Sequence, residues 1–336
     1  MSKSWLVTGG AGFIGSHFIT MILDTYGDDT VLCLDKLTYA GHLETMAPFL
    51  RHPRFAFVLG DITDAELLET LMSTRQFDAV VNFAAESHVD RSLQNADPFY
   101  KTNVEGVKVL FSACERHQVH FHHVSTDEVY GALTLGSTAR FTEESPLNPT
   151  SPYAKSKALA DAYLLAQGEK TGQPFTISRC SNNYGPYQYP EKLIPLMITQ
   201  ALRHEALPIY GDGRYVRDWL YVTDHCRAID LIVRHGRSGR LYNVSANHEI
   251  DNLSLVKQLL GLLDQPESLI TFVADRLNHD RRYALDASRL KRELGWTPLM
   301  PFDEGLKQTV TWYLDHPEWV KAVLAKTSAP IPKQTR

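Results

Sequence analysis

Short apolar runs alternate with longer helical patterns along the first half of the chain. The runs occupy residues 5–8, 30–35, 55–60, 79–83, 120–125 and 175–179. Most of the segments between them repeat apolar residues at helical spacing. Such βαβ alternation predicts a parallel, doubly wound sheet, because parallel strands need crossover helices that then cover both faces. The expected fold class is therefore α/β of the Rossmann type.

The pattern changes from about residue 181. Loops rich in Asn, Tyr, Gly and Pro at 181–190 and 210–213 alternate with shorter helical segments at 253–263 and 302–314. We interpret the chain as a Rossmann domain at 1–180, a smaller substrate-binding lobe at 181–325 and a flexible tail at 326–336. A segment near 214–240 is a candidate to return to the first domain. The loops of the lobe are expected to face the carboxyl ends of the strands, where ligands of open α/β sheets bind.

Composition narrows the classes of protein that this pattern allows. With 336 residues, of which 43% are hydrophobic and 22% charged, the chain can bury a full-sized core. The net charge of -5 gives no general attraction to nucleic acid or to anionic membranes, and no apolar stretch approaches the roughly 20 residues of a membrane span. We expect neither partner, and a cytoplasmic location. The four widely spaced cysteines form no Cys-x-x-Cys pair and are interpreted as reduced core thiols.

A glycine-rich turn supplies the first chemical signal. Gly9, Gly12 and Gly15 follow an apolar strand and begin a helical pattern, as a turn that brings backbone up to a pyrophosphate requires. Asp35 ends the next strand, twenty residues after Gly15, at the place where a carboxylate binds the adenosine ribose hydroxyls. Because that carboxylate would repel a 2′-phosphate, the motif predicts NAD rather than NADP.

A second signal is a tyrosine and a lysine four residues apart, Tyr153 and Lys157, after the fifth strand. Residues at this spacing share one helix face, so the ammonium is expected to lower the pKa of the phenol toward neutrality and make it a general base. A hydroxyl from Ser125 or Thr126, at the end of the fifth strand, can hold a substrate oxygen beside it. The histidines at 120, 122 and 123 are not interpreted as a metal site, because alternate strand residues face opposite sides.

Two adjacent carboxylates, Asp127 and Glu128, follow that hydroxyl directly. Burial and mutual repulsion both oppose ionisation of such a pair at the end of a buried strand. One interpretation is structural: Asp127 caps the next turn and Glu128 points to solvent. In the functional interpretation, one carboxyl is protonated and acts as an acid while the other is ionised and acts as a base. Elimination of water needs that division of labour.

Six segments together resemble the dTDP-glucose 4,6-dehydratases, which belong to the extended short-chain dehydrogenase/reductase superfamily. The segments are residues 8–15, 84–92, 125–131, 153–157, 179–186 and 217–219, and the similarity extends to about Trp319. The glycine and Tyr/Lys motifs specify only the superfamily, whereas Thr126, Asp127 and Glu128 together specify the dehydratase branch.

The resemblance implies a lyase of deoxysugar biosynthesis that converts dTDP-glucose to dTDP-4-keto-6-deoxyglucose and water. Tyr153 would accept the C4 hydroxyl proton as hydride passes to NAD, while Lys157 holds the ribose and Thr126 binds the C4 oxygen. Glu128 would then remove the C5 proton as Asp127 protonates the departing C6 hydroxyl. Hydride returns from NADH to C6, so the NAD is tightly bound and regenerated in each turnover.

The resemblance also implies two sets of binding residues. Those for the cofactor are Gly9, Gly12, Phe13, Ile14, Gly15, Asp35, Lys36, Leu37, Thr38, Asp61, Ile62, Phe83, Ala84, Ala85, Ser87, Thr102, Tyr153, Lys157 and Asn183. Those for the nucleotide-diphosphate glucose are Ser87, Thr126, Asn182, Lys192, Leu193, Pro208, Ile209, Tyr210, Arg217, Asn252, Asp275 and His279. Lys192 and Arg217 suit a diphosphate, since a net acidic protein must supply local cations to hold one.

Members of this superfamily commonly form homodimers through the helices that correspond to 97–117 and 152–169 here. Apolar residues at 104, 107, 110 and 111 are equally compatible with such pairing and with packing on the sheet. The homodimer is therefore expected from the resemblance alone.

One segment departs from the family pattern, and two other functions stay open. Leu277 and Asn278 stand where the family has Pro-Gly, which leaves the choice between thymidine and uridine nucleotides open. A nucleotide-sugar 4-epimerase would share the cofactor site, Tyr153 and Lys157 but would not need the paired acid and base. A non-catalytic NAD-binding scaffold would typically lose the tyrosine or the lysine, and both are present.

Overall fold

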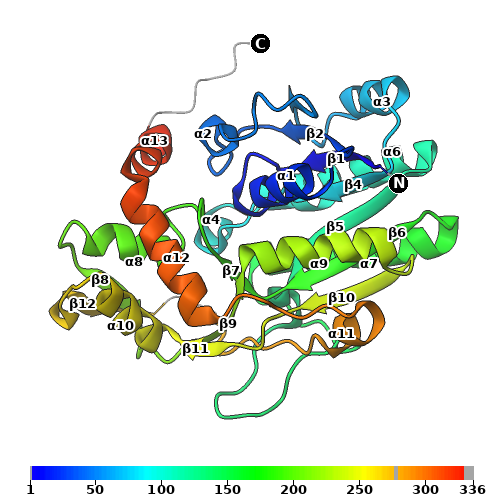
Figure 1. Cartoon of the computed structure of the whole chain (residues 1–336). Coiled ribbons are helices and arrows are strands. Elements are labelled where there is room, and N and C mark those ends of the chain that lie inside the picture. The colour runs from blue at the N-terminus through cyan, green and yellow to red at the C-terminus, as the bar shows by residue number, and fades with distance from the viewer. Residues whose placement is uncertain (1, 276–278, 329–336) are drawn as a thin grey trace.

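A parallel sheet of seven strands lies at the centre of the part of the chain that the structure describes (Figure 1). This computed structural model describes residues 2–275 and 279–328. The strand order is β10-β6-β5-β4-β1-β2-β3. The strands are β1 Ser4–Thr8, β2 Thr30–Asp35, β3 Phe55–Leu59, β4 Ala79–Asn82, β5 His120–Thr126, β6 Phe175–Cys180 and β10 Arg240–Val244. Strand order reverses between β1 and β4, which places a ligand crevice at their carboxyl ends.

Alternation of side chains along each strand lets helices cover both faces of the sheet. On β1, Leu6 belongs to the core cluster under α3, α6 and α7, whereas Trp5 and Val7 belong to the one under α1 and α9. These helices are α1 Phe13–Thr25, α3 Ala65–Thr74, α6 Val107–His117, α7 Pro152–Thr171 and α9 Val222–His235. The predicted α/β fold class is confirmed.

A second core lies among the elements that follow β6. Tyr184, Trp219 and Leu255 are among its buried residues. Its strands form two small sheets, of β7 Asn182–Tyr184, β9 Val216–Tyr221 and β11 Glu249–Asp251, and of β8 Leu207–Tyr210 and β12 Ile270–Val273. Its helices are α8 Leu193–Ala201, α10 Asn252–Leu262, α12 Phe302–Asp315 and α13 Pro317–Ser328. The domain boundaries themselves stay a prediction. Helix α13 includes residues 326–328 of the expected tail, and 329–336 lie outside the described residues.

Two elements differ from the sequence pattern. The expected single helix over 97–117 is α5 Asp97–Tyr100, a π-helical turn Lys101–Gly106 and then α6. The Asn103 amide in this turn bonds the backbone of Glu86 and, at 2.9 Å, the Ser156 hydroxyl, so the wider turn directs a polar side chain inward. Strand β10 was not predicted. It pairs only with β6 among the described strands, and its polar residues at 240 and 243 interrupt the apolar run that marks the other strands.

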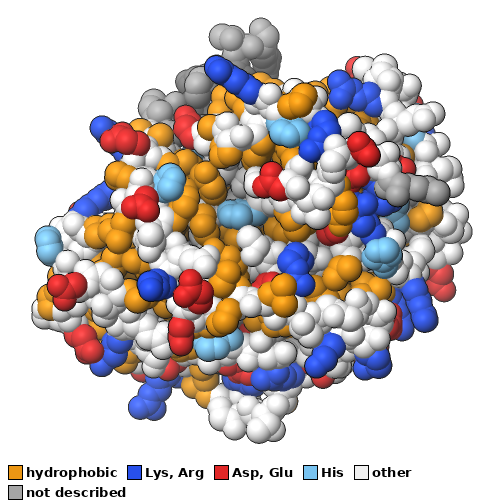
Figure 2. Space-filling model, viewed as in Figure 1, with side chains coloured by type: hydrophobic (Ala, Val, Ile, Leu, Met, Phe, Trp, Pro, Cys, Tyr) orange, Lys and Arg blue, Asp and Glu red, His pale blue; other side chains and the backbone are white. Residues whose placement is uncertain are grey.

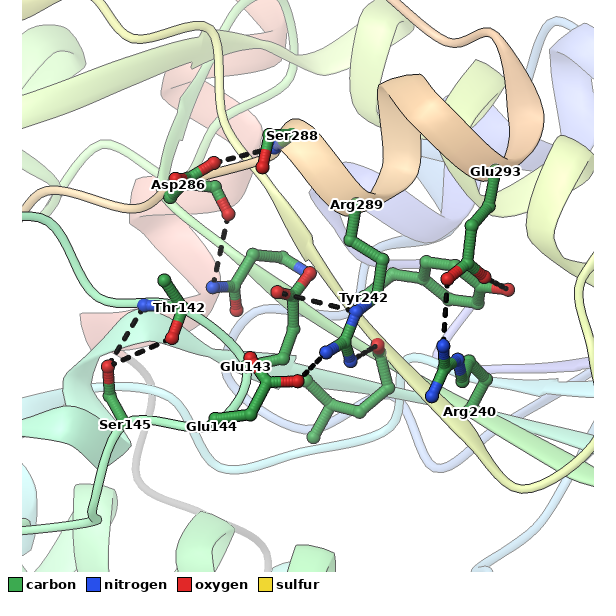
Figure 3. Close-up of polar contacts among 12 residues, drawn as sticks. Thr142, Glu143, Glu144, Ser145, Arg240, Tyr242, Asp286, Ser288, Arg289 and Glu293 are labelled. Atoms are coloured by element: carbon green, nitrogen blue, oxygen red, sulfur yellow. Dashed lines mark hydrogen bonds and ion pairs between the residues drawn. The ribbon is translucent and has the colours of Figure 1, made fainter.

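Polar contacts fasten the loop after β5 to β10 and to α11 Ser288–Leu294 (Figure 3). Arg289 on α11 forms ion pairs with Glu143, at 3.7 Å, and with Glu144. On β10, the Asn243 backbone N–H donates to the Glu143 carboxylate at 2.9 Å, and Arg240 pairs with Glu293 at 2.9 Å. These contacts hold the segment between β5 and α7, which carries residues of the candidate site.

The remaining short elements connect the layers. They are α2 Leu43–Met46, α4 Val89–Gln94 and the 3-10 turns Asp127–Tyr130 and Glu267–Leu269. On the face shown in Figure 2, acidic and basic side chains are interspersed, so this face has no large patch of one sign. None of the described helices has both the length and the apolar content that crossing a membrane would require.

A buried ion pair joins α7 to β6 behind the candidate site. Arg179 Nε donates to Asp161 Oδ2 at 2.8 Å, and the side chains are only 3% and 0% exposed. Ser125 Oγ donates to the same oxygen at 3.0 Å. The Arg179 guanidinium also lies 4.7 Å from the centre of the Tyr130 ring.

We expect Arg179→Met to lower the free energy of unfolding by about 3–5 kcal/mol, because it leaves the Asp161 charge buried without its partner. Urea unfolding curves of the purified variant and the wild type measure the change. Arg116→Met is the control, since Arg116 pairs with Glu69 at the surface, where the side chains are 51% and 48% exposed. Solvent screens a pair as exposed as this one, so its loss should change the free energy of unfolding far less. Equal losses in the two variants would contradict the prediction.

Candidate active site

The glycine turn between β1 and α1 packs against the end of β4. Gly9 has φ +71°, and a Cβ there would lie 2.5 Å from the backbone nitrogen of Ala84. A Cβ on Gly15 would lie 2.4 Å from the Gly9 carbonyl oxygen. Gly12 caps the N-terminus of α1 and offers no side-chain bond to the first helical turn. Backbone amides at the positive end of the helix dipole therefore face the crevice, as the motif predicted.

Asp35, at the end of β2, is fixed beside this turn by backbone donors. Its Oδ2 accepts from Ala11 N at 2.9 Å and its Oδ1 from Leu37 N at 2.7 Å. Lys36 reaches across to Asp61 Oδ2 at 2.6 Å. Although partial burial acts to raise the pKa of Asp61, hydrogen bonds from Lys36 and Thr63 hold it below its usual value. Two carboxylates therefore border the end of the crevice next to the glycine turn.

A single cavity of about 310 Å³ extends from the glycine turn to the ends of β5 and β6. It is lined by almost all of the residues predicted for the cofactor, by the five predicted catalytic residues and by Ser87, Asn182 and Lys192. The predicted residues that do not line it are Leu37, Leu193, Pro208, Ile209, Tyr210, Arg217, Asn252, Asp275 and His279.

The lining also includes residues that sequence reasoning missed. They are Leu34, Tyr39, Ala40, Gly41, Gly60, Glu86, Val124, Cys180, Ser181, Gln188, Tyr189 and Glu191. Cys180 ends β6 beside Thr126 and Ser181 follows it, so their place at the carboxyl edge of the sheet was an available signal. Tyr39 and residues 188–191 come from loops whose position depends on tertiary packing, and their sequence carries no such signal.

Several of the predicted substrate residues gather in a second group around Tyr215. The ring of His279 stacks on Tyr215 with 3.6 Å between centroids, and its Nδ1 lies 2.9 Å from Asp275 Oδ1. Asn252 N donates to the Tyr215 carbonyl at 3.0 Å. Arg217 is buried and donates to the Asp280 carbonyl at 3.0 Å. Leu277 and Asn278, where the chain departs from the family pattern, lie outside the described residues.

The end of β5 places an acid and a second carboxylate in the cavity. Asp127 is 3% exposed, its Oδ1 accepts from the Thr126 hydroxyl at 3.2 Å, and its Oδ2 has no hydrogen-bond partner among the described residues. Burial, and then the negative charges of Glu128 and Asp218, raise the pKa of Asp127 well above its usual value, against the opposing charge of Arg217. Asp127 therefore keeps its proton to a higher pH than an ordinary aspartate does.

The structural interpretation of the carboxylate pair is wrong. Thr126, not Asp127, caps the following turn, because its hydroxyl accepts from the Glu128 N–H at 3.3 Å. Glu128 is half-buried and lines the cavity rather than pointing freely to solvent.

Tyr153 and Lys157 lie one turn apart on α7, whose N-terminus is capped by Ser151. The predicted lowering of the Tyr153 pKa is wrong for the chain by itself. Burial raises that pKa well above its usual value and the Glu128 charge adds to the rise, while a hydrogen bond with Thr126 opposes it. The spacing places Lys157 on the right face but does not fix where its ammonium points, and Nζ donates instead to the Val124 carbonyl at 2.7 Å.

Comparison with known proteins gives one consistent result. The family model for GDP-mannose 4,6 dehydratase matches residues 6–309. A dTDP-glucose 4,6-dehydratase from Xanthomonas campestris pv. campestris (strain B100) is 49% identical over 340 residues, with 96% of each chain covered. The chain belongs to the dTDP-glucose 4,6-dehydratase family. The resemblance drawn from the sequence is thereby confirmed, and a dehydratase is a lyase that eliminates water.

Solved structures place the dehydratase family nearer than the epimerases. The crystal structure of the dTDP-glucose 4,6-dehydratase from Streptomyces venezuelae, with NAD and TYD bound, matches this chain with a TM-score of 0.92 and 47% sequence identity. The match covers 95% of this chain and 99% of that one. A UDP-glucose 4-epimerase from Thermotoga maritima, solved with UDP-glucose, gives 0.86 at 30% identity, covering 93% of this chain and 99% of that one. Dehydratase and epimerase thus share the fold, and sequence identity favours the dehydratase.

Proposed function

We propose that this chain converts dTDP-glucose to dTDP-4-keto-6-deoxyglucose and water with a tightly bound NAD that is regenerated in each turnover. The observation that carries the proposal is the cavity that joins the glycine turn and Asp35 to Asp127, Glu128 and Tyr153. A carboxyl with a raised pKa next to a second carboxylate is what elimination of water needs and what epimerisation at C4 does not.

The residues at the β1–α1 turn fit NAD. The backbone amides of the turn and the start of α1 would hold the pyrophosphate, and Gly12 keeps that approach free of a side chain. Asp35, already oriented by two backbone donors, would accept hydrogen bonds from the adenosine ribose hydroxyls. When bound, NAD supplies an acceptor for the hydride of C4 and a donor for C6.

The chain's own residues would divide the remaining chemistry between them. Tyr153, in its phenolate form, accepts the proton of the C4 hydroxyl, and Thr126 donates to the C4 oxygen. The new C4 ketone acidifies the C5 proton, which Glu128 removes. The electron pair forms the C5–C6 double bond as the C6–O bond breaks, and Asp127 gives its proton to the leaving hydroxyl to form water. Glu128 later returns a proton to C5.

Incubation of the purified protein with dTDP-glucose and with UDP-glucose in turn, without added NAD, tests this function. We expect mass loss of one water and the base-labile 4-keto chromophore with dTDP-glucose, and the UDP-glucose arm reports the nucleotide preference. Interconversion of glucose and galactose nucleotides without mass change would instead establish an epimerase. Absence of any reaction in protein that retains NAD would favour the scaffold.

We further propose a homodimer and a cytoplasmic location. The outward face of α7 carries Leu159, which is 50% exposed, and Leu165, which is 38% exposed, next to exposed alanines at 162 and 166. An apolar stripe on a long helix suits a twofold interface with a second copy. The apolar face of α6 is not available for a dimer interface, because Val107, Leu110 and Phe111 are buried against the sheet. All four cysteines are buried free thiols, as expected in a reducing compartment.

We expect Leu159→Arg to raise the dimer dissociation constant by roughly a hundredfold or more, because the twofold axis would bury two unpaired guanidinium groups. Sedimentation equilibrium measures the change. Leu314→Arg on α12 is the control, since Leu314 is 48% exposed but lies on a different helix. A wild-type protein that is monomeric, or an unchanged dimer in Leu159→Arg, would contradict the proposed interface.

A further inference from the structure

Two buried histidines on β5 point to opposite faces of the sheet and make different contacts. His122 and His123 are both 0% exposed. His122 bonds Thr176 at 2.9 Å and Ser178 at 3.0 Å on the neighbouring strand β6. His123 instead places its Nε2 3.2 Å from the Nζ of Lys157. Of the two rings, that of His123 is thus the one in contact with a residue that lines the cavity.

A chain of side chains orients the His123 ring. Its Nδ1 lies 3.1 Å from Nδ2 of Asn82 on β4, and Asn82 Oδ1 accepts from the Thr8 hydroxyl at the end of β1 at 2.6 Å. Thr8, Asn82 and His123 are all buried. The contacts cross the sheet from the strand that precedes the glycine turn to the helix that carries Lys157. A rigid support of this kind fixes the direction in which a long lysine side chain points.

The charges around Lys157 come from three elements. On α7, Asp161 lies one turn beyond it and Tyr153 one turn before it. Cys180 faces it from β6, and His123 from β5. Burial lowers the pKa of Lys157 to about 8, and the Asp161 charge opposes that fall. Burial also lowers the pKa of His123 well below its usual value, so the ring is neutral beside the ammonium.

We propose that His123, held by Asn82, is a positioning residue that accepts a hydrogen bond from the Lys157 ammonium and fixes it toward the reacting end of the cavity. The inference rests on the proposed function, because its test follows the oxidation of dTDP-glucose at C4, in which Lys157 acts beside Tyr153. Val124 and His123 accept two of the three ammonium protons of Lys157. These two hydrogen bonds fix the direction in which the third N–H bond points.

The proposal determines where the protons lie in the hydrogen bonds that link Lys157, His123, Asn82 and Thr8. If Nε2 accepts from the ammonium, the single proton of the neutral ring is on Nδ1. The structure places Asn82 Nδ2 toward the ring and Asn82 Oδ1 toward the Thr8 hydroxyl. The proposal requires these two amide atoms to be exchanged, so that the oxygen faces the ring and the Thr8 hydroxyl accepts from the NH₂ group. Nitrogen-15 NMR of histidine-labelled protein therefore should show the Nδ1-protonated tautomer for His123, whose signals are identified by their loss in His123→Gln.

The first variant to test is His123→Leu, in a Glu128→Gln background where only the first oxidation at C4 is followed. Loss of a neutral acceptor destabilises the Lys157 ammonium and lowers its pKa. The rate of reduced nicotinamide formation on mixing with dTDP-glucose should then decline at a pH about one unit lower than in the Glu128→Gln parent. On this basic limb of the pH profile, the rate should be roughly tenfold lower than in the parent at the same pH. His123→Gln, which keeps an acceptor at about the same place, should restore most of the profile.

The control is His122→Leu, which removes an equally buried histidine of the same strand without touching Lys157. It should lower stability but leave the pH profile in place. The proposal is overturned if His123→Leu keeps the parent profile, if His122→Leu shifts it equally, or if His123 is protonated on Nε2. These outcomes differ from a failure of the proposed function, in which the wild-type protein itself would not dehydrate dTDP-glucose.

Discussion

Glu128→Gln will form reduced nicotinamide on mixing with dTDP-glucose but will not release water at an appreciable rate. The amide keeps the shape of the side chain but cannot accept the C5 proton, whereas oxidation at C4 depends on Tyr153, Lys157 and Thr126. We expect kcat for water release to fall by about 10²–10⁴-fold, the usual contribution of a general base. Absorbance of the reduced nicotinamide and mass spectrometry of the sugar nucleotide follow the two steps separately.

Solvent exchange sharpens this result. In deuterated water the Glu128→Gln protein should incorporate no deuterium at C5, because no group there removes the proton. Glu69→Gln, at an exposed site that is 48% accessible, is the control and should turn over as the wild type does. Wild-type rates of water release in Glu128→Gln would show that another group is the base.

Asp127→Asn is expected to stop the reaction one step later. Burial and the charges of Glu128 and Asp218 raise the pKa of Asp127, which suits an acid, and an amide cannot give up a proton to the leaving hydroxyl. The variant should therefore oxidise C4 and exchange the C5 proton with solvent but lose water about 10²–10⁴-fold more slowly than the wild type. The diagnostic result is a sugar nucleotide that carries deuterium at C5 but has not lost water.

The pair of variants tests the assignment as well as the need for both carboxyls. If Asp127→Asn blocks C5 exchange and Glu128→Gln permits it, the acid and base roles are reversed. Since the Asp127 pKa is raised, its proton is kept to a higher pH than in an ordinary aspartate and is lost as the pH rises through the raised value. Water release should accordingly slow on the basic side in the wild type, and this limb should be absent in Asp127→Asn.

Much of the cofactor end of the cavity could be predicted from local sequence. Gly9, Gly12 and Gly15 lie in a turn where a side chain would collide with backbone, and Asp35 ends the following strand within reach of that turn. Turn geometry and strand periodicity are set by residues close in the chain, so they are visible in its pattern. The same holds for Asp127 and Glu128, whose place at a strand end follows from the apolar run before them.

The tertiary structure decided what the pattern left open. Strand β10 pairs with β6 although it begins 60 residues later in the sequence, counted from Cys180 to Arg240. Its polar residues gave no strand signal. The apolar face of α6 packs on the sheet, a choice that periodicity could not make. Tyr39 and Glu191 line the cavity from distant loops, and Arg217 acts on Asp127 from β9.

Sequence by itself thus determined the fold class, the family and the residue types that carry the chemistry. Only the tertiary structure decided the direction of their pKa shifts and of their side chains. The pKa values of Asp127 and Tyr153 are both raised, and Lys157 points at His123 and Val124. The physical reason is that a pKa and a side-chain direction depend on burial and on neighbours brought together from several strands, and neither is encoded in the spacing of residues along one helix.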